Sequence, residues 1–224
     1  MSNVAHVDRL VYNGCMTASP RTRQQSAARA RILKTAHDLF YRDGIRATGI
    51  DRVIAEAEVT KVTFYRHFHS KGELIEEFLA YRHERWMSWF VEALARHGGG
   101  PTAIAAALEE WLQKPEFRGC AFINVVAELP DGGTQIAAIA RNHKDDMRRA
   151  IAQVLPTSPR RAQLAASLAL AFDGAIVRAQ MDGTPAQAVA SFREVERALL
   201  KPRAGRVILR TRARRRSTQL ATTA

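Results

Sequence analysis

Cysteine is scarce in this sequence, and long apolar runs are missing from it. The 224 residues include two cysteines, Cys15 and Cys120, which lie far apart in the chain. Two distant thiols supply neither a disulfide framework nor the paired spacing of a zinc site. No stretch approaches the roughly 18 continuous apolar residues of a membrane span, and the N-terminus has no apolar signal-peptide core. These absences predict a cytoplasmic protein.

Acidic residues are missing from residues 201–224, which carry eight Lys or Arg side chains. Residues 20–70 carry ten basic and five acidic residues, and residues 71–200 carry 15 and 16, within a net charge of +12. The ends are therefore basic and the middle is neutral, which indicates a polyanionic partner such as nucleic acid. The basic tail has two interpretations: a solvated, disordered segment or an auxiliary contact.

Apolar residues recur at helical spacing along most of the chain, so we predict an all-α fold of about nine helices. Residues 1–25 lack this periodicity and are expected to form a flexible arm, in which Met16 is an alternative start to Met1. The run 119–129 is ambiguous between a strand and a buried helix. A helix is favoured, because no other segment offers a partner strand.

Residues 58–71, EVTKVTFYRHFHSK, combine aromatic rings with positive charge. As a strand, this segment would put Arg66 on its apolar face. As a helix, it brings Phe64 and Phe68 together at i,i+4 and faces the short apolar helix expected over residues 50–57. Two such helices joined by a tight turn form a helix-turn-helix. A metal site at His67 and His69 is disfavoured, because residues at i,i+2 diverge on a helix.

Side-chain caps are expected at three helix starts in this region. Thr48 with Asp51, and Ser70 with Glu73, have capping-box spacing, and Thr60 is the expected N-cap of the second short helix. The outward side chains of that helix suit duplex DNA: Lys61, Thr63 and Tyr65 for phosphates, Arg66 for a guanine edge and Val62 for a thymine methyl. The N-terminus of the next helix, at Ser70 and Lys71, could hold a phosphate.

The segment Thr48–Leu74 resembles the DNA-binding signature of the TetR family of transcriptional regulators. The similarity extends over roughly residues 26–86 and includes the turn, the caps and the Phe-Tyr-x-His-Phe run at 64–68. The resemblance implies a homodimeric repressor of a pseudo-palindromic operator, released by a small-molecule inducer, with no cofactor. The candidate DNA contacts are Thr48, Lys61, Val62, Thr63, Tyr65, Arg66, His67 and Lys71. Three positions depart from the family pattern: Gly49, Glu58 at a turn glycine, and Val62.

The resemblance also implies a domain organisation. The expected parts are an arm over 1–25, a DNA-binding domain over 26–86 with its motif at 49–68, a ligand-binding and dimerisation domain over 87–200, and a basic tail over 201–224. Of the helices expected over about 159–181 and 185–200, the first is apolar nearly all round, and the second offers Val189, Phe192, Val195 and Leu199. They are either ordinary core helices or, as the resemblance favours, a dimer interface.

An inducer pocket is expected between helices of residues 87–180. The candidate lining residues are Trp89, Trp111, Phe122, Asn124, Glu128, Phe172 and Asp173. Polar groups within apolar helices need a partner, and a carboxylate-lined pocket would favour cationic amphipathic ligands. Two other functions stay open: a charge-driven, nonspecific nucleic-acid-binding protein and an enzyme in a helical bundle. No catalytic triad or phosphate-binding glycine loop is found in the sequence, so no catalytic or metal-binding residue is assigned.

Overall fold

The computed structural model describes residues 20–129 and 133–201, which form nine helices and no strand. The helices are α1 (Pro20–Asp43), α2 (Ile50–Glu56), α3 (Lys61–His67), α4 (Lys71–Arg96), α5 (Ala103–Leu112), α6 (Ala121–Glu128), α7 (Gly133–Val154), α8 (Arg161–Asp182) and α9 (Ala186–Leu200). The predicted all-α class is confirmed, and the ambiguous run 119–129 contains α6. Most of the expected N-terminal arm and basic tail lies outside the described residues.

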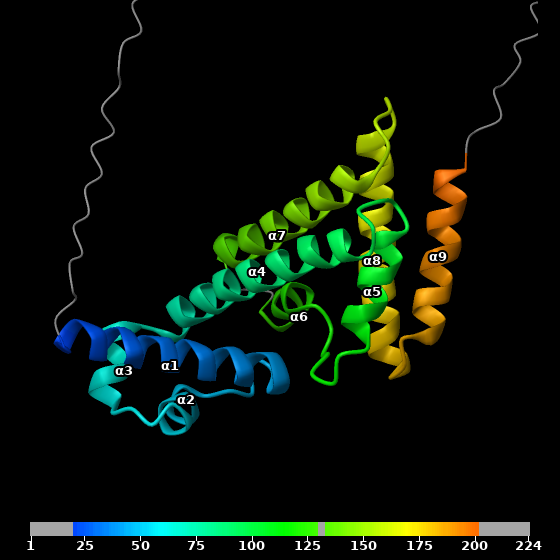
Figure 1. Ribbon diagram of the computed structural model, residues 1–224. Helices are drawn as coiled ribbons and strands as arrows, with labels where there is room; N and C mark the ends of the chain where they lie inside the picture. The colour runs from blue at the N-terminus through cyan, green and yellow to red at the C-terminus, as the bar shows by residue number, and fades with distance from the viewer. Residues whose placement is uncertain (1–19, 130–132, 202–224) are drawn as a thin grey trace, which may run out of the picture.

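The first three helices gather at one end of the molecule, around the start of α4 (Figure 1). Their shared core contains Ile32, Leu39, Phe64, Phe68 and Phe78, all of which are buried. Helix α1 begins several residues before the periodic pattern that starts at 27, because its polar first turns give no apolar signal in the sequence.

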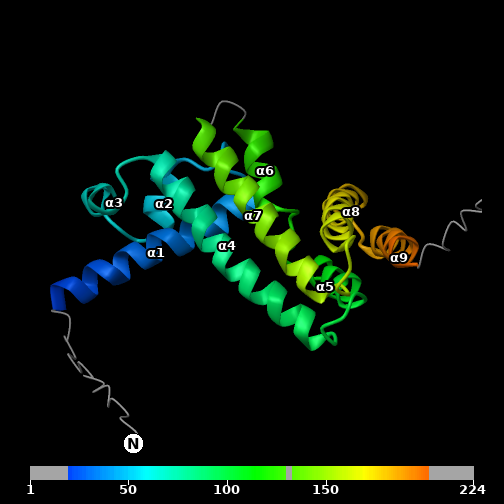
Figure 2. The same cartoon turned by 90° about the horizontal axis from the view of Figure 1, so that it is seen from above.

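Helix α4 runs without a break through the domain boundary expected after residue 86. Its first half packs on α1, and its second half packs on α5 and α7 (Figures 1 and 2). A movement of α4 would therefore change its packing on α1 as well as on α5 and α7. The division into a DNA-binding and a ligand-binding domain stays a prediction.

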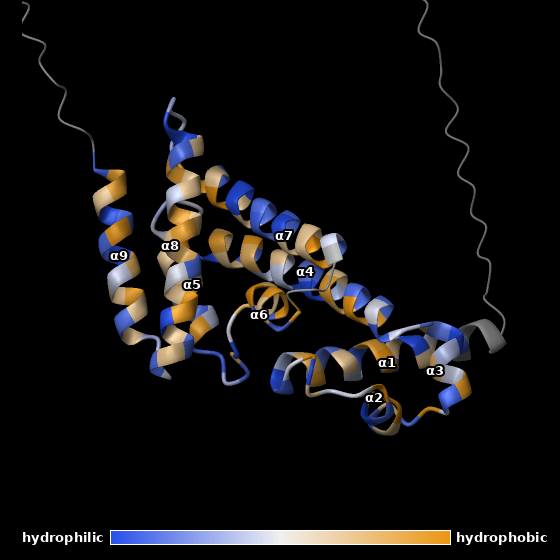
Figure 3. Cartoon of the chain, turned by 180° about the vertical axis from the view of Figure 1, so that it is seen from behind, coloured by the Kyte–Doolittle hydropathy of each residue, from blue (hydrophilic) through white to orange (hydrophobic). Residues whose placement is uncertain are grey.

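Helices α8 and α9 lie side by side at the far end of the molecule in both views (Figures 1 and 2). Among the described helices, α8 alone is long and apolar enough by composition to cross a membrane. Its contacts with α7 and α9 bury part of this apolar surface, and apolar positions follow its length (Figure 3). Both helices begin slightly later than the expected starts at 159 and 185: α8 begins at Arg161 and α9 at Ala186, each without a side-chain cap.

Aromatic rings fill the space between α4, α5, α8 and α9. Trp86 stacks on Phe90 with ring centroids 4.7 Å apart, and Phe172 meets Phe192 edge-on at 5.9 Å. Trp111 closes the cluster 5.2 Å from Trp86. Since such pairs contribute about 0.5–1.5 kcal/mol beyond their area burial, this cluster fixes α4 against the last two helices.

Candidate functional site

The helix-turn-helix consists of α2 and α3, joined by residues 57–60. Thr60 caps α3 as predicted, because its hydroxyl oxygen accepts from the Thr63 N–H at 3.1 Å. Phe64 and Phe68 are fully buried, with ring centroids 6.0 Å apart, and Val53 of α2 is equally buried. The aromatic residues of the segment therefore attach α3 to the core and leave its opposite face free.

The outer face of α3 carries Lys61, Val62, Tyr65 and Arg66, all exposed. Val62 is 70% exposed and Tyr65 is 40% exposed, values that are high for side chains of this kind. The Lys61 ammonium lies 3.5 Å from the Asp51 carboxylate, but both side chains are largely in solvent, where such a pair contributes little. This face combines cations, a hydroxyl and exposed methyl groups on one short helix.

Glu58 adopts a left-handed backbone conformation with φ of 52°, the one such non-glycine residue among those described. This conformation costs an L-residue about 1–2 kcal/mol. Arg31 of α1 reaches across to the turn: its Nε donates to the Ala57 carbonyl at 3.2 Å and its Nη2 to the Glu58 carbonyl at 3.5 Å. Arg31 thus holds the strained turn in the place where the family pattern has glycine.

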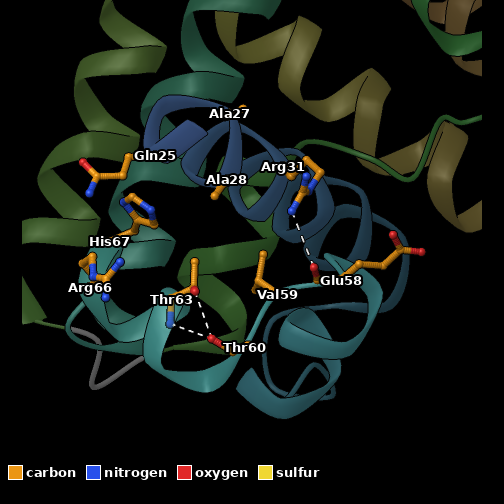
Figure 4. A pocket seen from close by; sticks show the side chains of 10 residues that line it. All are labelled: Gln25, Ala27, Ala28, Arg31, Glu58, Val59, Thr60, Thr63, Arg66 and His67. Atoms are coloured by element: carbon orange, nitrogen blue, oxygen red, sulfur yellow. Dashed lines mark hydrogen bonds between the residues drawn. The ribbon is translucent and has the colours of Figure 1, made fainter. Parts of the chain in front are cut away.

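A groove of about 650 Å³ separates α3 from the first half of α1. Thr63, Arg66 and His67 form its α3 side, and Gln25 and Arg31 stand opposite on α1 (Figure 4). The groove is polar, and its charged groups other than Glu58 are cationic. It extends the outer face of α3 sideways toward the start of α1, which makes the candidate interface broader than one helix.

His67 is half-buried in this groove, and burial lowers its pKa, with the charges of Arg29 and Arg66 acting in the same direction. Burial therefore favours the neutral imidazole, which can act as a hydrogen-bonding group. Its neighbour His69 instead pairs with Glu73, Nδ1 to Oε2 at 3.0 Å. Residues 20–129 and 133–201 contain no cluster of three or more His, Cys, Asp or Glu arranged for a metal ion.

The structure contradicts the roles expected for the Thr48 side chain. Thr48 is fully buried, and its hydroxyl donates to the Gly44 carbonyl at 2.7 Å, so it neither caps α2 nor reaches the surface. The N-cap of α2 is Gly49, without a side-chain bond. By contrast, the predicted Ser70 cap of α4 is present, because its hydroxyl oxygen accepts from the Glu73 N–H at 3.1 Å.

Lys71 and Glu128 hold the loop between α1 and α2. The Lys71 ammonium donates to the Ile45 carbonyl at 2.7 Å, and burial lowers the pKa of this lysine. Glu128 Oε2 accepts from the Ile45 and Arg46 N–H groups at 2.7 and 2.9 Å. Lys71 was expected to contact a phosphate, but in the protein alone its ammonium group is bonded to a backbone carbonyl. Glu128 links α6 to the loop between α1 and α2.

The seven candidate ligand residues do not line one common space. Trp89 and Trp111 line a cavity of about 200 Å³ beside α1, α4 and α5. Phe122 and Asp173 line a separate apolar groove of about 550 Å³ between α6, α7 and α8. Phe172 is fully buried within the aromatic core.

The polar candidates are bonded within the protein, so they do not form together the single carboxylate-lined pocket that was expected. The Asn124 amide donates to the Arg118 carbonyl at 3.0 Å and closes the loop before α6. The Lys144 ammonium donates to Asp173 at 2.6 Å. Since Glu128 is occupied by backbone N–H groups, none of the three attracts a cationic ligand by lacking a partner.

The sequence interpretation missed the cations of the smaller cavity. Arg82 and Arg85 line it together with Trp86 and Trp89 of the same helix, and Lys114 contributes from the loop after α5. Part of this cavity could have been predicted from the sequence, because residues 82, 85, 86 and 89 share one helical face. The approach of Lys114 to this face depends on the fold.

A protein-family model described as bacterial regulatory proteins, tetR family, matches residues 32–78. These residues run from within α1 through α2 and α3 into α4. The match therefore coincides with the helix-turn-helix and its supporting helices.

Curated and solved proteins show the same similarity. An uncharacterised HTH-type transcriptional regulator of Lactococcus lactis subsp. lactis is 26% identical over 104 residues, 44% of this chain and 53% of that protein. TtgR, an HTH-type transcriptional regulator of Pseudomonas putida, is 34% identical over 65 residues, 29% of this chain and 31% of its own length. The chain thus spans about half or less of these curated relatives. A crystal structure of a TetR-family transcriptional regulator from Streptomyces coelicolor matches with a TM-score of 0.68 and 29% identity, covering 82% of this chain and 97% of that one.

Proposed function

Because the chain belongs to the tetR family of bacterial regulatory proteins, we propose that it is a sequence-specific DNA-binding transcriptional regulator. One observation carries the proposal: α3 buries Phe64 and Phe68 and leaves Lys61, Val62, Tyr65 and Arg66 exposed on its other face. A helix with this division is supported from behind and free to enter the major groove, about 12 Å wide.

The side chains of this face suit distinct parts of DNA. Lys61 is suited to a phosphate, and the Tyr65 hydroxyl can donate to another phosphate oxygen. Arg66 can pair with the two acceptors of a guanine edge, and the Val62 methyl groups can touch a thymine methyl. In this proposal the cationic groove beside α1 receives the flanking phosphates.

Dimerisation through α8 and α9 is part of the proposal. Leu170 and Met181 on α8 are 76% and 71% exposed, and Val177 and Val195 add apolar surface nearby. Apolar side chains in solvent on two adjacent helices are typical of an interface. Two copies related by a two-fold axis would present two α3 helices to half-sites about 34–36 Å apart on a palindromic operator.

We propose that the protein acts in the cytoplasm, where the DNA is, and represses transcription when no ligand is bound. A small molecule would regulate this activity. A ligand that shifts α4 would change the separation of the two α3 helices and release the DNA. A binding role is favoured over an enzymatic one, because Asn124, Glu128 and Asp173 are engaged in structural bonds. A charge-driven nonspecific binder is the alternative, and it depends on the basic tail outside the described residues.

The proposal is tested by selecting bound sequences from random duplex DNA with the purified full chain. A palindromic motif with two half-sites is expected. Arg66→Ala should weaken binding to that motif by about 1–3 kcal/mol and relax preference at one base pair. The matched control Arg149→Ala, which removes the same charge from the exposed side of α7, should leave the affinity unchanged.

Deleting residues 201–224 separates the two binding modes. A specific regulator keeps its base preference after the deletion, whereas a charge-driven binder loses most of its affinity and its salt dependence. Recovery of random sequences, together with an equal effect of Arg66→Ala and Arg149→Ala, would count against specific readout by α3.

A further inference from the structure

The cavity of about 200 Å³ next to α4 is lined mainly by aromatic rings, those of Tyr41, Trp86, Trp89, Trp111 and Phe117. It lies where α1 of the DNA-reading end meets α4, α5 and the loop that follows α5. Its volume is below the usual 300–1,000 Å³ of drug-sized sites, and a cavity of about 150 Å³ can hold one benzene-sized molecule. The space therefore suits a single ring with a short substituent.

Three cations surround this aromatic cavity, and none forms an ion pair with another described residue. The Arg82 guanidinium lies 4.0 Å from the centre of the Tyr41 ring, and the Lys114 ammonium lies 4.3 Å from the Trp89 ring. Arg85 donates to the neutral Tyr81 hydroxyl at 3.0 Å. Cations held against ring faces keep most of their N–H donors available.

The remaining polar groups of the lining do not cancel this charge. Glu116 is the one carboxylate among the residues that line the cavity, and its side chain is exposed. Glu110, nearby on α5, is already bound to the Trp89 N–H at 3.0 Å and to Arg96 at 2.8 Å. The indole N–H of Trp86 is buried and has no acceptor among the described residues. The wall thus offers donors and an excess of positive charge.

We propose that this cavity binds a small aromatic anion, with the ring against the tryptophans and the anionic group against Arg82, Arg85 and Lys114. The aromatic walls select a planar ring by stacking, and the cations select its charge by charge-assisted hydrogen bonds. Such a ligand has the opposite charge to the cationic amphiphile that the sequence suggested.

The cavity also lies at a joint through which occupancy can reach the DNA-reading end. The Tyr41 hydroxyl donates to the Gly119 carbonyl at 2.9 Å and accepts from the Arg118 N–H at 3.1 Å. An anion that draws Arg82 off the Tyr41 ring changes the environment of this bond between α1 and the loop before α6. The assignment of the ligand as the effector of DNA binding rests on the proposed function; the binding site itself does not.

Intrinsic fluorescence tests the site directly, because all three tryptophans of the chain, Trp86, Trp89 and Trp111, line it. The purified full chain is titrated, without DNA, with benzoate, its neutral analogue benzamide and its cationic analogue benzamidinium. Benzoate is expected to give a saturable change and to bind at least about tenfold more tightly than benzamide, since charged hydrogen bonds are the stronger ones. Equal binding of benzoate and benzamide, or tighter binding of benzamidinium, would overturn the proposal.

Charge-removing variants identify the cations responsible. Arg85→Gln and Lys114→Gln should each weaken benzoate binding by about tenfold, whereas the control Arg149→Gln should leave it unchanged. Arg85 and Lys114 make no ion pair among the described residues, so the variants are expected to fold, and circular dichroism checks this. No saturable change with benzoate up to about 10 mM, which would nearly saturate a millimolar site, contradicts the proposal, as does an unaltered affinity in both variants.

The proposed regulator function is measured separately by binding of the ligand-free chain to selected DNA. If benzoate binds but no specific DNA is found, the site stands and the proposed function fails. If specific DNA is bound but benzoate is not, the function stands and the anion site fails. If both are bound and benzoate leaves the DNA affinity unchanged, the effector assignment is wrong.

Discussion

Removing the Glu128 carboxylate is expected to destabilise the joint between α6 and the DNA-reading end. One oxygen of Glu128 accepts from the backbone N–H groups of Ile45 and Arg46 at 2.7 and 2.9 Å. Both carboxylate oxygens lie 3.2 Å from where a Cβ on Gly44 would sit, so the fit to the chain reversal is close. Glu128→Ala leaves both N–H groups without this acceptor, and no other side chain is recorded as bonded to them.

The magnitude follows from the two bonds. A hydrogen bond to a charged group contributes about 1.5–3 kcal/mol, but Arg46 is exposed, so water replaces part of the second bond. We therefore expect Glu128→Ala to lower the free energy of unfolding by about 2 kcal/mol, equivalent to a fall in Tm of about 4–8 °C for a chain of this size. Glu128→Gln keeps an acceptor oxygen but not its charge, and should lose about half as much.

Thermal and urea unfolding of the purified chain measure this effect. The matched control is Glu84→Ala on α4, an exposed carboxylate with no hydrogen bond or ion pair recorded among the described residues, for which a change within about 0.5 kcal/mol is expected. If Glu128→Ala and Glu84→Ala shift the midpoint equally, the Glu128 contacts do not stabilise the fold and the reasoning from geometry is refuted.

Substitutions at three further positions test the strained turn and two buried ionisable groups. Glu58→Gly relieves the left-handed backbone and should raise the free energy of unfolding, measured in urea, by about 0.5 kcal/mol after the added chain entropy of glycine is subtracted. Glu58→Ala keeps the strain and should give no gain in stability. Burial raises the pKa of Glu196 to about 7, above its ordinary value of 4.5, so the folded state loses stability as pH rises from about 4.5 to 7. Glu196→Gln should remove that loss, with an advantage near pH 8 of up to about 3 kcal/mol and none at pH 4; an equal effect at both pH values would contradict a buried ionisable carboxyl. Burial, with the charges of Lys144 and His83, lowers the pKa of His143 from 6.5 to about 2, so stability should fall below pH 6.5 by at most about 1.4 kcal/mol per pH unit. Urea unfolding of His143→Phe between pH 7.5 and 5 should show a shallower decline than the parent protein, and an unchanged slope would exclude this histidine as its cause.

The helix-turn-helix was predictable because local rules govern it. The Thr60 and Ser70 caps, the burial of Phe64 and Phe68 and the exposed outer face of α3 follow from side chains within four positions of one another. Helical periodicity determines which residues share a face, and capping depends on the first turn alone. These parts of the structure agree with the sequence prediction.

The long-range partners were not predictable in the same way. Thr48 has the spacing of a cap but lies in the core, because the chain between α1 and α2 turns its hydroxyl toward Gly44. Nothing in the sequence indicates that Arg31 and Lys71 each bond a backbone carbonyl 26 residues away. A polar side chain bonds whatever the fold brings within about 3 Å, and sequence spacing carries no information about that neighbour.

The all-α fold, the helix-turn-helix and the side chains that α3 exposes follow from the sequence, since they depend on periodicity and on short-range hydrogen bonds. The link that Glu128 makes between two parts of the chain, and the position of Arg82, Arg85 and Lys114 around an aromatic cavity, depend on long-range packing. The same composition is compatible with an acidic or a cationic cavity, because the sign of its charge depends on which ionisable groups find partners elsewhere. Here Glu110 is bonded within the protein, and Arg82 and Lys114 face the rings.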